Sequence, residues 1–282
     1  MVPDRRKNDV YLRRRIVVGI GALVALGLVA SGVAIVTAPR APDAAAPAST
    51  PPASASLSEV PAESVKPAPK PTPEQPEFDK AARSIDDPAS IWVVANKTRP
   101  LSPLSFAPAD LVTAKVPYTA NAVLRAEAAA AMEQMFAAAQ AEGAGSLMLQ
   151  NAYRSYETQV SLHNSTVARL GKDKARAQSA IPGYSEHQTG LSADIMSSPQ
   201  VCSVEACFGQ TPQGIWLAEN AWRFGYHLRY PADKTPVTGY IYEPWHYRYI
   251  GVELATEMRN KGITTLEEFF RLPPAPDYAP GV

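Results

Sequence analysis

The feature that most limits what this chain can fold into is an uncharged apolar run near its N-terminus, residues 16–38. These 23 residues are rich in Val, Ile, Leu, Ala and Gly. At about 1.5 Å of rise per residue, a helix of this length crosses a hydrocarbon layer of about 30 Å. Three arginines directly before the run and a Pro-rich stretch after it argue against a buried core helix. A cleaved signal peptide is the other alternative, although its apolar core is normally shorter, at about 7–15 residues. We therefore expect an uncleaved, single-pass membrane anchor.

The charges beside this run predict its orientation and exclude one class of protein. Residues 1–15 carry six basic and two acidic side chains, a net +4, so the rest of the chain carries −4 of a total of zero. Basic residues next to a span stay in the cytoplasm, so residues 1–15 should form a cytoplasmic stub and everything after residue 38 should be extracytoplasmic. The zero total excludes a generally basic protein that coats nucleic acid.

The remaining chain divides into a linker, one domain and a tail. Residues 39–77 are rich in Pro and Ala, contain no aromatic side chain and have Leu57 as their only leucine. Such a segment cannot bury enough apolar surface to offset the entropy of ordering, so we expect a disordered linker. The globular part, 78–272, has the size of one ordinary domain. Residues 273–282 contain four prolines and are also expected to be disordered.

Helical and strand patterns alternate within 78–272. Helices are expected at 119–142, at 155–170 with Ser155 as N-cap, at 211–224 and at 251–261. A capping-box spacing at 264–267 precedes a final short helix. Strands are expected at 146–150, 190–196 and 240–250. The pattern predicts an α+β domain with a small antiparallel sheet flanked by helices.

The two cysteines, Cys202 and Cys207, are five residues apart in the sequence VCSVEAC. An even number of cysteines in an oxidising compartment favours a disulfide between them. A metal-binding pair is the alternative, but C-x4-C without a second pair is a poor zinc signature. We expect the disulfide.

Two short segments hold the residues that point to chemistry. In the first, His187 and Asp194 are joined through a glycine turn, so they can converge if the chain loops and then enters a strand. In the second, Pro244 should bend the chain between Glu243 and His246, which brings both side chains to one cavity. Two histidines and one carboxylate form a familiar ligand set for catalytic zinc, and a further carboxylate can deprotonate water.

This pattern makes His187, Asp194 and His246 candidate ligands of one zinc ion and Glu243 a candidate general base. The chain lacks the helical H-E-x-x-H motif, so it is not a zincin. Taken singly, each histidine can equally be a structural residue, and Asp194 can be a turn or cap residue.

The same segments carry a resemblance to a known family. SEHQTGLSAD at 185–194 and EPWHYR at 243–248 resemble the zinc and base motifs of VanY-type D-alanyl-D-alanine carboxypeptidases, which belong to the LAS group of zinc peptidases. AYRSYETQ at 152–159 is similar to a third motif of that family, and the resemblance covers residues 91–270. Ser192 stands where many relatives have Ala or Val.

The resemblance implies a fold, a cofactor and further site residues. The fold would be that of the hedgehog and D-Ala-D-Ala peptidases, with one zinc ion. Arg154 would stabilise the oxyanion or pair with a substrate carboxylate. Tyr156, Gln159 and Ser185 would form hydrogen bonds with the C-terminal end of the substrate.

The resemblance also implies a function. The chain would be a membrane-anchored, extracytoplasmic zinc carboxypeptidase that removes the C-terminal D-Ala from peptidoglycan stem peptides. A carboxypeptidase or endopeptidase of the same family with another scissile bond, including an L,D-carboxypeptidase, is a close variant. A non-catalytic wall-binding or sensor domain is the alternative from a different class, and the presence of Glu243 speaks against it.

Overall fold

The computed structural model of the chain describes residues 77–281. The predicted stub at 1–15, the anchor at 16–38 and all but the last residue of the linker at 39–77 lie outside these residues. Within 77–281, no helix has both the length and the apolar character that crossing a bilayer requires.

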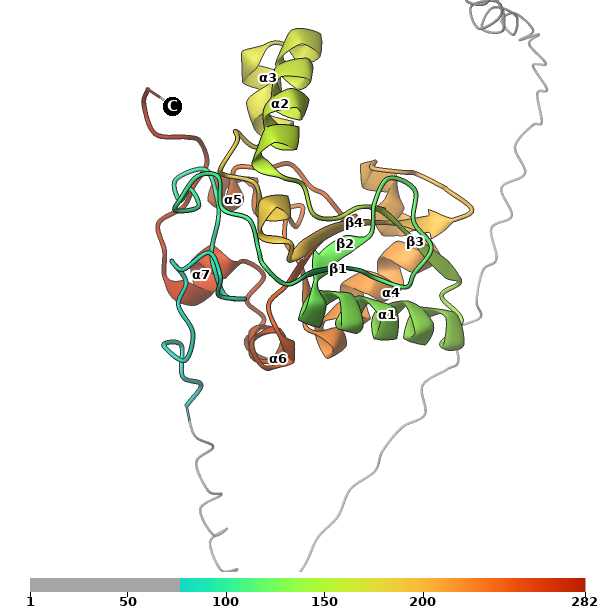
Figure 1. Cartoon of the computed structure of the whole chain (residues 1–282). Coiled ribbons are helices and arrows are strands. Elements are labelled where there is room, and N and C mark those ends of the chain that lie inside the picture. Colours follow the sequence, from blue (N-terminus) through green and yellow to red (C-terminus); the bar gives the residue numbers. More distant parts are fainter. Residues whose placement is uncertain (1–76, 282) are drawn as a thin grey trace, which may run out of the picture. The chain divides into compact units, whose positions relative to one another are not determined.

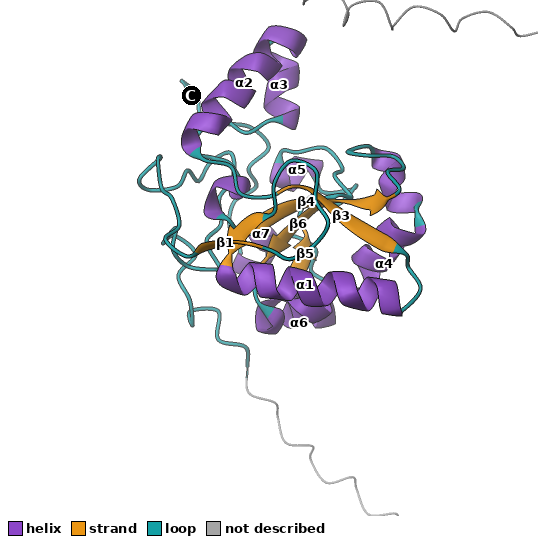
Figure 2. Ribbon diagram, turned by 45° about the vertical axis from the view of Figure 1, so that its right-hand side comes forward, coloured by secondary structure: helices purple, strands orange, loops and turns teal. Residues whose placement is uncertain are grey.

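A four-stranded antiparallel sheet forms the centre of the described domain (Figure 2). Its strands, in spatial order, are β3 (Ser146–Asn151), β4 (Ser192–Ser198), β6 (His246–Tyr249) and β5 (Tyr226–Leu228). A second, two-stranded antiparallel sheet pairs β1 (Leu111–Thr113) with β2 (Val123–Arg125). The predicted α+β class with a small antiparallel sheet is confirmed.

Helices lie on both sides of this sheet. One face is covered by α1 (Ala126–Ala141), α4 (Pro212–Asn220) and α6 (Val252–Lys261) (Figure 2). On the other side, α2 (Tyr156–Leu170) and α3 (Lys172–Gln178) form a hairpin that extends away from the sheet (Figure 1). The remaining helices are short: α5 (Thr235–Thr238), α7 (Leu266–Phe270) and the 3-10 turns η1 (Glu186–Thr189), η2 (Ala206–Gln210) and η3 (Ala221–Phe224).

Several predicted elements are shorter in the structure than the sequence pattern suggested. The helix expected at 119–142 begins at Ala126, because the residues of β2 use their backbone groups to pair with β1. The helix expected at 211–224 is split between α4 and η3 at Asn220, whose φ of −124° is not helical. The strand expected at 240–250 is confined to β6, because a turn occupies the residues around Pro244. The Ser155 cap is present, since its side chain accepts a hydrogen bond from the Thr158 N–H.

The capping box of α7 is shifted by one residue from its predicted position. Thr265, and not Thr264, is the N-cap, and its hydroxyl accepts from the Glu268 N–H at 3.2 Å. Glu267, the expected partner, is fully buried and pairs with Arg229 instead.

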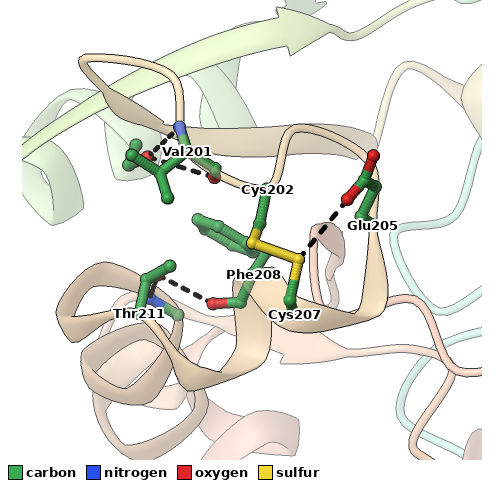
Figure 3. The surroundings of a disulfide bond; sticks show 8 residues. Val201, Cys202, Glu205, Cys207, Phe208 and Thr211 are labelled. Carbon is green, nitrogen blue, oxygen red and sulfur yellow. Dashed lines mark hydrogen bonds between the residues drawn. A yellow bond between two sulfur atoms is a disulfide. The ribbon is translucent and has the colours of Figure 1, made fainter. Parts of the chain in front are cut away.

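The predicted disulfide between Cys202 and Cys207 is present (Figure 3). It closes the loop between β4 and α4, and Figure 3 places the buried Phe208 beside the sulfur pair. The Thr211 hydroxyl donates to the Phe208 carbonyl at 2.7 Å and starts α4 directly after the loop. The disulfide therefore holds the loop between β4 and α4 against the core.

The C-terminal segment differs from its predicted disorder. Residues 273–281 have no helix or strand, yet Ala275 is completely buried and Tyr278 is 6% exposed. The four prolines suggested a disordered tail. Instead, the buried side chains of Ala275 and Tyr278 pack against the domain.

A tight turn at Gly190 joins η1 to β4. Its φ is +67°, a left-handed conformation that glycine adopts without strain. A Cβ added there would lie 2.9 Å from Leu111 Cδ2 and 3.1 Å from Arg125 Cγ. The turn thus needs glycine both for its backbone angle and for its close approach to the second sheet.

We predict that Gly190→Ala lowers the free energy of unfolding by about 2–4 kcal/mol, the sum of left-handed backbone strain and a steric clash. Gly143→Ala is the matched control, because Gly143 has φ +83° but no atom within 4 Å of an added Cβ. Gly143→Ala should lower the free energy of unfolding by about 1–2 kcal/mol, the cost of the left-handed backbone alone. Urea unfolding measures both, and equal losses would contradict the steric argument.

Candidate active site

A cavity of about 510 Å³ opens between the α2–α3 hairpin, the disulfide loop and the segment before β6. Six of the residues singled out in the sequence line it: Arg154, Ser185, His187, Asp194, Glu243 and His246. The structure therefore brings together side chains that are up to 92 positions apart in the chain (154 to 246).

Three potential metal ligands meet at the base of this cavity. Asp194 of β4 and His246 of β6 are directly opposite each other in the antiparallel register, and the Gly190 turn places His187 next to them. Asp194 Oδ1 lies 3.4 Å from His187 Nε2 and 3.2 Å from His246 Nδ1. One ligand atom from each residue lies within 4.8 Å of the other two. Two imidazole nitrogens and one carboxylate oxygen suit Zn²⁺.

Each imidazole ring is held by its other nitrogen. His187 Nδ1 lies 2.7 Å from the Ala152 carbonyl, which can only accept, so Nδ1 carries the proton and Nε2 is free to bind a metal. His246 Nε2 faces Glu186 Oε2 at 3.4 Å, which leaves Nδ1 toward Asp194. Both rings thus present a ligand atom to the same point, and the residues fit a zinc ion.

The protonation of the ligands follows from their burial and neighbours. Burial lowers the pKa of His187, which favours the neutral ring that metals bind. Burial also acts to lower the pKa of His246, but hydrogen bonds to Asp194 and Glu186 raise it to about 9. A metal ion must therefore compete with a proton at His246 Nδ1.

Glu243 lies beside this ligand set through the predicted bend. The His246 N–H donates to the Glu243 carbonyl at 3.0 Å, and this turn folds the Glu243 side chain back until Oε2 is 3.9 Å from His246 Nδ1. Burial raises the pKa of Glu243 to about 8, and a bound cation would lower it again. A carboxylate whose proton affinity is raised next to a metal site suits a general base.

Arg154 lines the cavity, whereas Gln159 and Tyr156 do not. Gln159 is completely buried; its Oε1 accepts from Arg154 Nη1 at 2.9 Å, and its Nε2 donates to the Ala180 carbonyl at 2.7 Å. With both ends of its amide engaged, Gln159 orients the guanidinium instead of reaching into the cavity. Tyr156 is the first residue of α2 and lies outside the cavity lining.

Comparison with known proteins agrees with this geometry. The family model "VanY: D-alanyl-D-alanine carboxypeptidase" matches residues 121–252. A putative carboxypeptidase, YodJ of Bacillus subtilis (strain 168), is 38% identical over 192 residues, which cover 66% of this chain and 69% of that protein. The chain belongs to the VanY family.

Solved structures of the family resemble the described domain. The LdcB LD-carboxypeptidase has a TM-score of 0.60 and 38% identity, covering 65% of this chain and 87% of its own. A vancomycin-resistance D,D-pentapeptidase VanY variant in complex with Zn(II) has a TM-score of 0.53 and 31% identity, covering 64% and 98%. A D-alanyl-D-alanine carboxypeptidase of Enterococcus faecium is 37% identical, but the match spans only 44% of that protein. The chain is a carboxypeptidase of the VanY family.

Sequence reasoning missed a buried ion network behind the ligands of this VanY-family protein. Glu186 Oε1 accepts from Arg229 Nε at 2.8 Å and from Arg248 Nη1 at 3.1 Å, while Oε2 faces His246. Arg229 also forms a bidentate pair with Glu267, at 2.7 and 2.9 Å. The four charged side chains are at most 1% exposed and carry two positive and two negative charges. Two positions in the motifs could have indicated it: Glu186 beside His187, and Arg248 two residues after His246.

Further hydrogen bonds complete this network. Burial acts to raise the pKa of Glu186, but Arg229 and Arg248 hold it well below its usual range, so the carboxylate is charged. The Ser192 hydroxyl donates to Glu186 Oε2 at 3.2 Å, so the serine that departs from the family pattern adds a bond that Ala or Val cannot make. Asn96 donates to Glu267 Oε1 at 2.9 Å.

We predict that Glu186→Gln lowers the free energy of unfolding by about 3–5 kcal/mol, because only one carboxylate, that of Glu267, then remains to balance two buried guanidinium groups. Glu142→Gln is the control, because Glu142 also pairs with an arginine, Arg223, but on the surface. This change should lower the free energy of unfolding only slightly. Urea unfolding at neutral pH compares the two, and a similar small loss for both would contradict the role of the network.

Proposed function

We propose that this VanY-family protein is a zinc-dependent D-alanyl-D-alanine carboxypeptidase that hydrolyses the C-terminal D-Ala of peptidoglycan stem peptides outside the cytoplasm. The convergence of His187, Asp194 and His246 next to Glu243 is the observation that carries this proposal. The relative solved with Zn(II) supports the choice of metal.

The cavity residues divide the chemistry between them. Bound at His187, Asp194 and His246, a zinc ion would supply Lewis acidity toward the scissile carbonyl and the attacking water. Glu243 accepts the proton of that water and returns it to the leaving amine, for which its raised pKa is suited. Arg154, oriented by Gln159, offers guanidinium hydrogen bonds to the negative charge on the oxyanion or on the substrate carboxylate. Ser185 lines the cavity as a hydrogen-bonding partner for the peptide.

The extracytoplasmic, membrane-anchored location is part of the proposal. It rests on the basic residues before the apolar run at 16–38 and on the Cys202–Cys207 disulfide, which is typical of oxidising compartments. Stem peptides are exposed in that same compartment.

We predict that metal content and turnover can be separated by mutation. The purified full chain should hold about one zinc per molecule, the number that one three-ligand catalytic site binds. Asp194→Ala should reduce that content, whereas Glu243→Gln should keep the metal and lower kcat by about 10²–10⁴, the usual contribution of a general base. Metal analysis and a D-Ala release assay measure both quantities. Full turnover in Glu243→Gln would overturn the assigned base.

We predict which stem peptide the full chain cleaves. It should release one D-Ala from a synthetic pentapeptide ending in D-Ala-D-Ala, and mass analysis of the products detects the loss. Release only from a tetrapeptide with a single terminal D-Ala would make it an L,D-carboxypeptidase, and cleavage of a cross-linked dimer alone an endopeptidase. A zinc-loaded protein that cleaves none of the three would be a binding domain.

A further inference from the structure

The C-terminal segment packs beside the cavity. The Ala275 N–H donates to the Val237 carbonyl at 2.8 Å, and a Cβ at Gly239 would collide with the Ala275 and Pro276 carbonyls. Residues after Pro273 therefore lie tightly on the turn that follows α5, which leads into the cavity wall at Tyr240.

Tyr278 connects this turn to a second, distant segment. Its hydroxyl accepts from the Ile181 N–H at 3.0 Å and shares a hydrogen bond with the Tyr240 hydroxyl at 3.2 Å. Its ring packs edge-to-face on Tyr184, with the centroids 5.3 Å apart. One buried side chain thus contacts two segments that are 59 positions apart (181 to 240).

Two cations contact the tyrosine cluster. Lys97, which is 3% exposed, has its Nζ 4.8 Å from the Tyr240 ring centroid and 5.5 Å from that of Tyr278. Its ammonium also donates to the Gly239 carbonyl at 2.5 Å. Arg176 of α3 lies 5.1 Å from the Tyr278 ring and pairs with Asp277 at 3.8 Å. These contacts stabilise the Tyr278 ring where it packs between the two segments.

Both segments that Tyr278 joins continue into the active site. Tyr184 and Tyr240 line the cavity, and Tyr278 does not. Tyr184 precedes the ligand His187 by three residues, and Tyr240 precedes the base Glu243 by three. The two cavity walls are therefore connected by a residue that does not itself line the cavity.

We propose that Tyr278 is a positioning residue for substrate binding: it clamps the Tyr184 and Tyr240 walls at the spacing that the peptide requires. This inference deepens the proposed carboxypeptidase function and rests on it. The metal ligands also have supports outside the clamp: Ala152 holds His187, and strand pairing and Glu186 hold His246. The clamp reaches His246 only indirectly, since the Tyr240 ring packs on Tyr230 and Tyr230 packs on His246.

The test compares Tyr278→Phe and Tyr278→Ala with Tyr226→Phe in the full chain. Tyr226 is the matched control: it is also buried, its hydroxyl donates to a backbone carbonyl, that of Ala128, at 2.7 Å, and its ring packs edge-to-face on Tyr249. It does not line the active-site cavity. All three variants should lose stability.

Only the Tyr278 variants should change substrate binding. For the stem peptide that the wild type cleaves, KM should rise about threefold to tenfold, the factor that one lost buried hydrogen bond gives. Their kcat and zinc content should remain close to those of the wild type. An unchanged KM in Tyr278→Phe would overturn the proposal, and this milder variant decides the question if Tyr278→Ala does not fold.

Hydrogen exchange tests the clamp without relying on turnover. In Tyr278→Phe, amide exchange should rise about threefold or more in peptides covering 180–185 and 239–243. The first segment loses the acceptor of the Ile181 N–H, and the second loses the hydrogen bond of the Tyr240 hydroxyl. Tyr226→Phe should leave these peptides unchanged. If the wild type cleaves no stem peptide, the carboxypeptidase proposal fails, while hydrogen exchange still reports on the clamp. Unchanged exchange in both segments of Tyr278→Phe would overturn the clamp itself.

Discussion

Glu186 lies between two arginines with 1% of its side chain exposed, and the ion network around it joins segments that are far apart in the chain. Arg229 extends the network to α7 through Glu267, and Arg248 extends it to the N-terminal loop through the Ile91 and Val93 carbonyls. Burying four charges is costly unless every charge is matched. The network is balanced, and it meets the cavity through Glu186, which lines the cavity and contacts His246, and through Arg229, which packs on the cavity residue Tyr230. The bonds that support His246 in the active site are therefore also bonds that support the fold.

The local parts of the fold and the candidate site follow from the sequence because they depend on near neighbours. The glycine turn between His187 and Asp194, the bend at Pro244 and the Ser155 cap each involve residues within a few positions of one another. Their chemistry is local, so short motifs indicate it well. The disulfide, whose cysteines are five residues apart, belongs to the same group.

The long-range parts could not be predicted because nothing in the spacing connects them. Arg229 and Glu267 are 38 positions apart, and each alone has the pattern of a surface residue. The strand β5 has only three residues and follows a helix end, so no alternation was visible. Gln159 was predicted to bond the substrate, whereas in the structure its amide bonds Arg154 and Ala180 and does not line the cavity. The Pro-rich composition of the C-terminal segment likewise predicted disorder, although Tyr278 is buried against the domain.

The pairing of Asp194 with His246 across β4 and β6 has one further consequence. Side chains alternate between the two faces of a strand, so a slip of one residue in this ladder would send one partner to the opposite face. A protein molecule that binds metal at both residues must therefore have its two central strands in the correct register. A metal ion bound at these residues would link the two strands across the middle of the sheet and would favour the native pairing over misregistered alternatives.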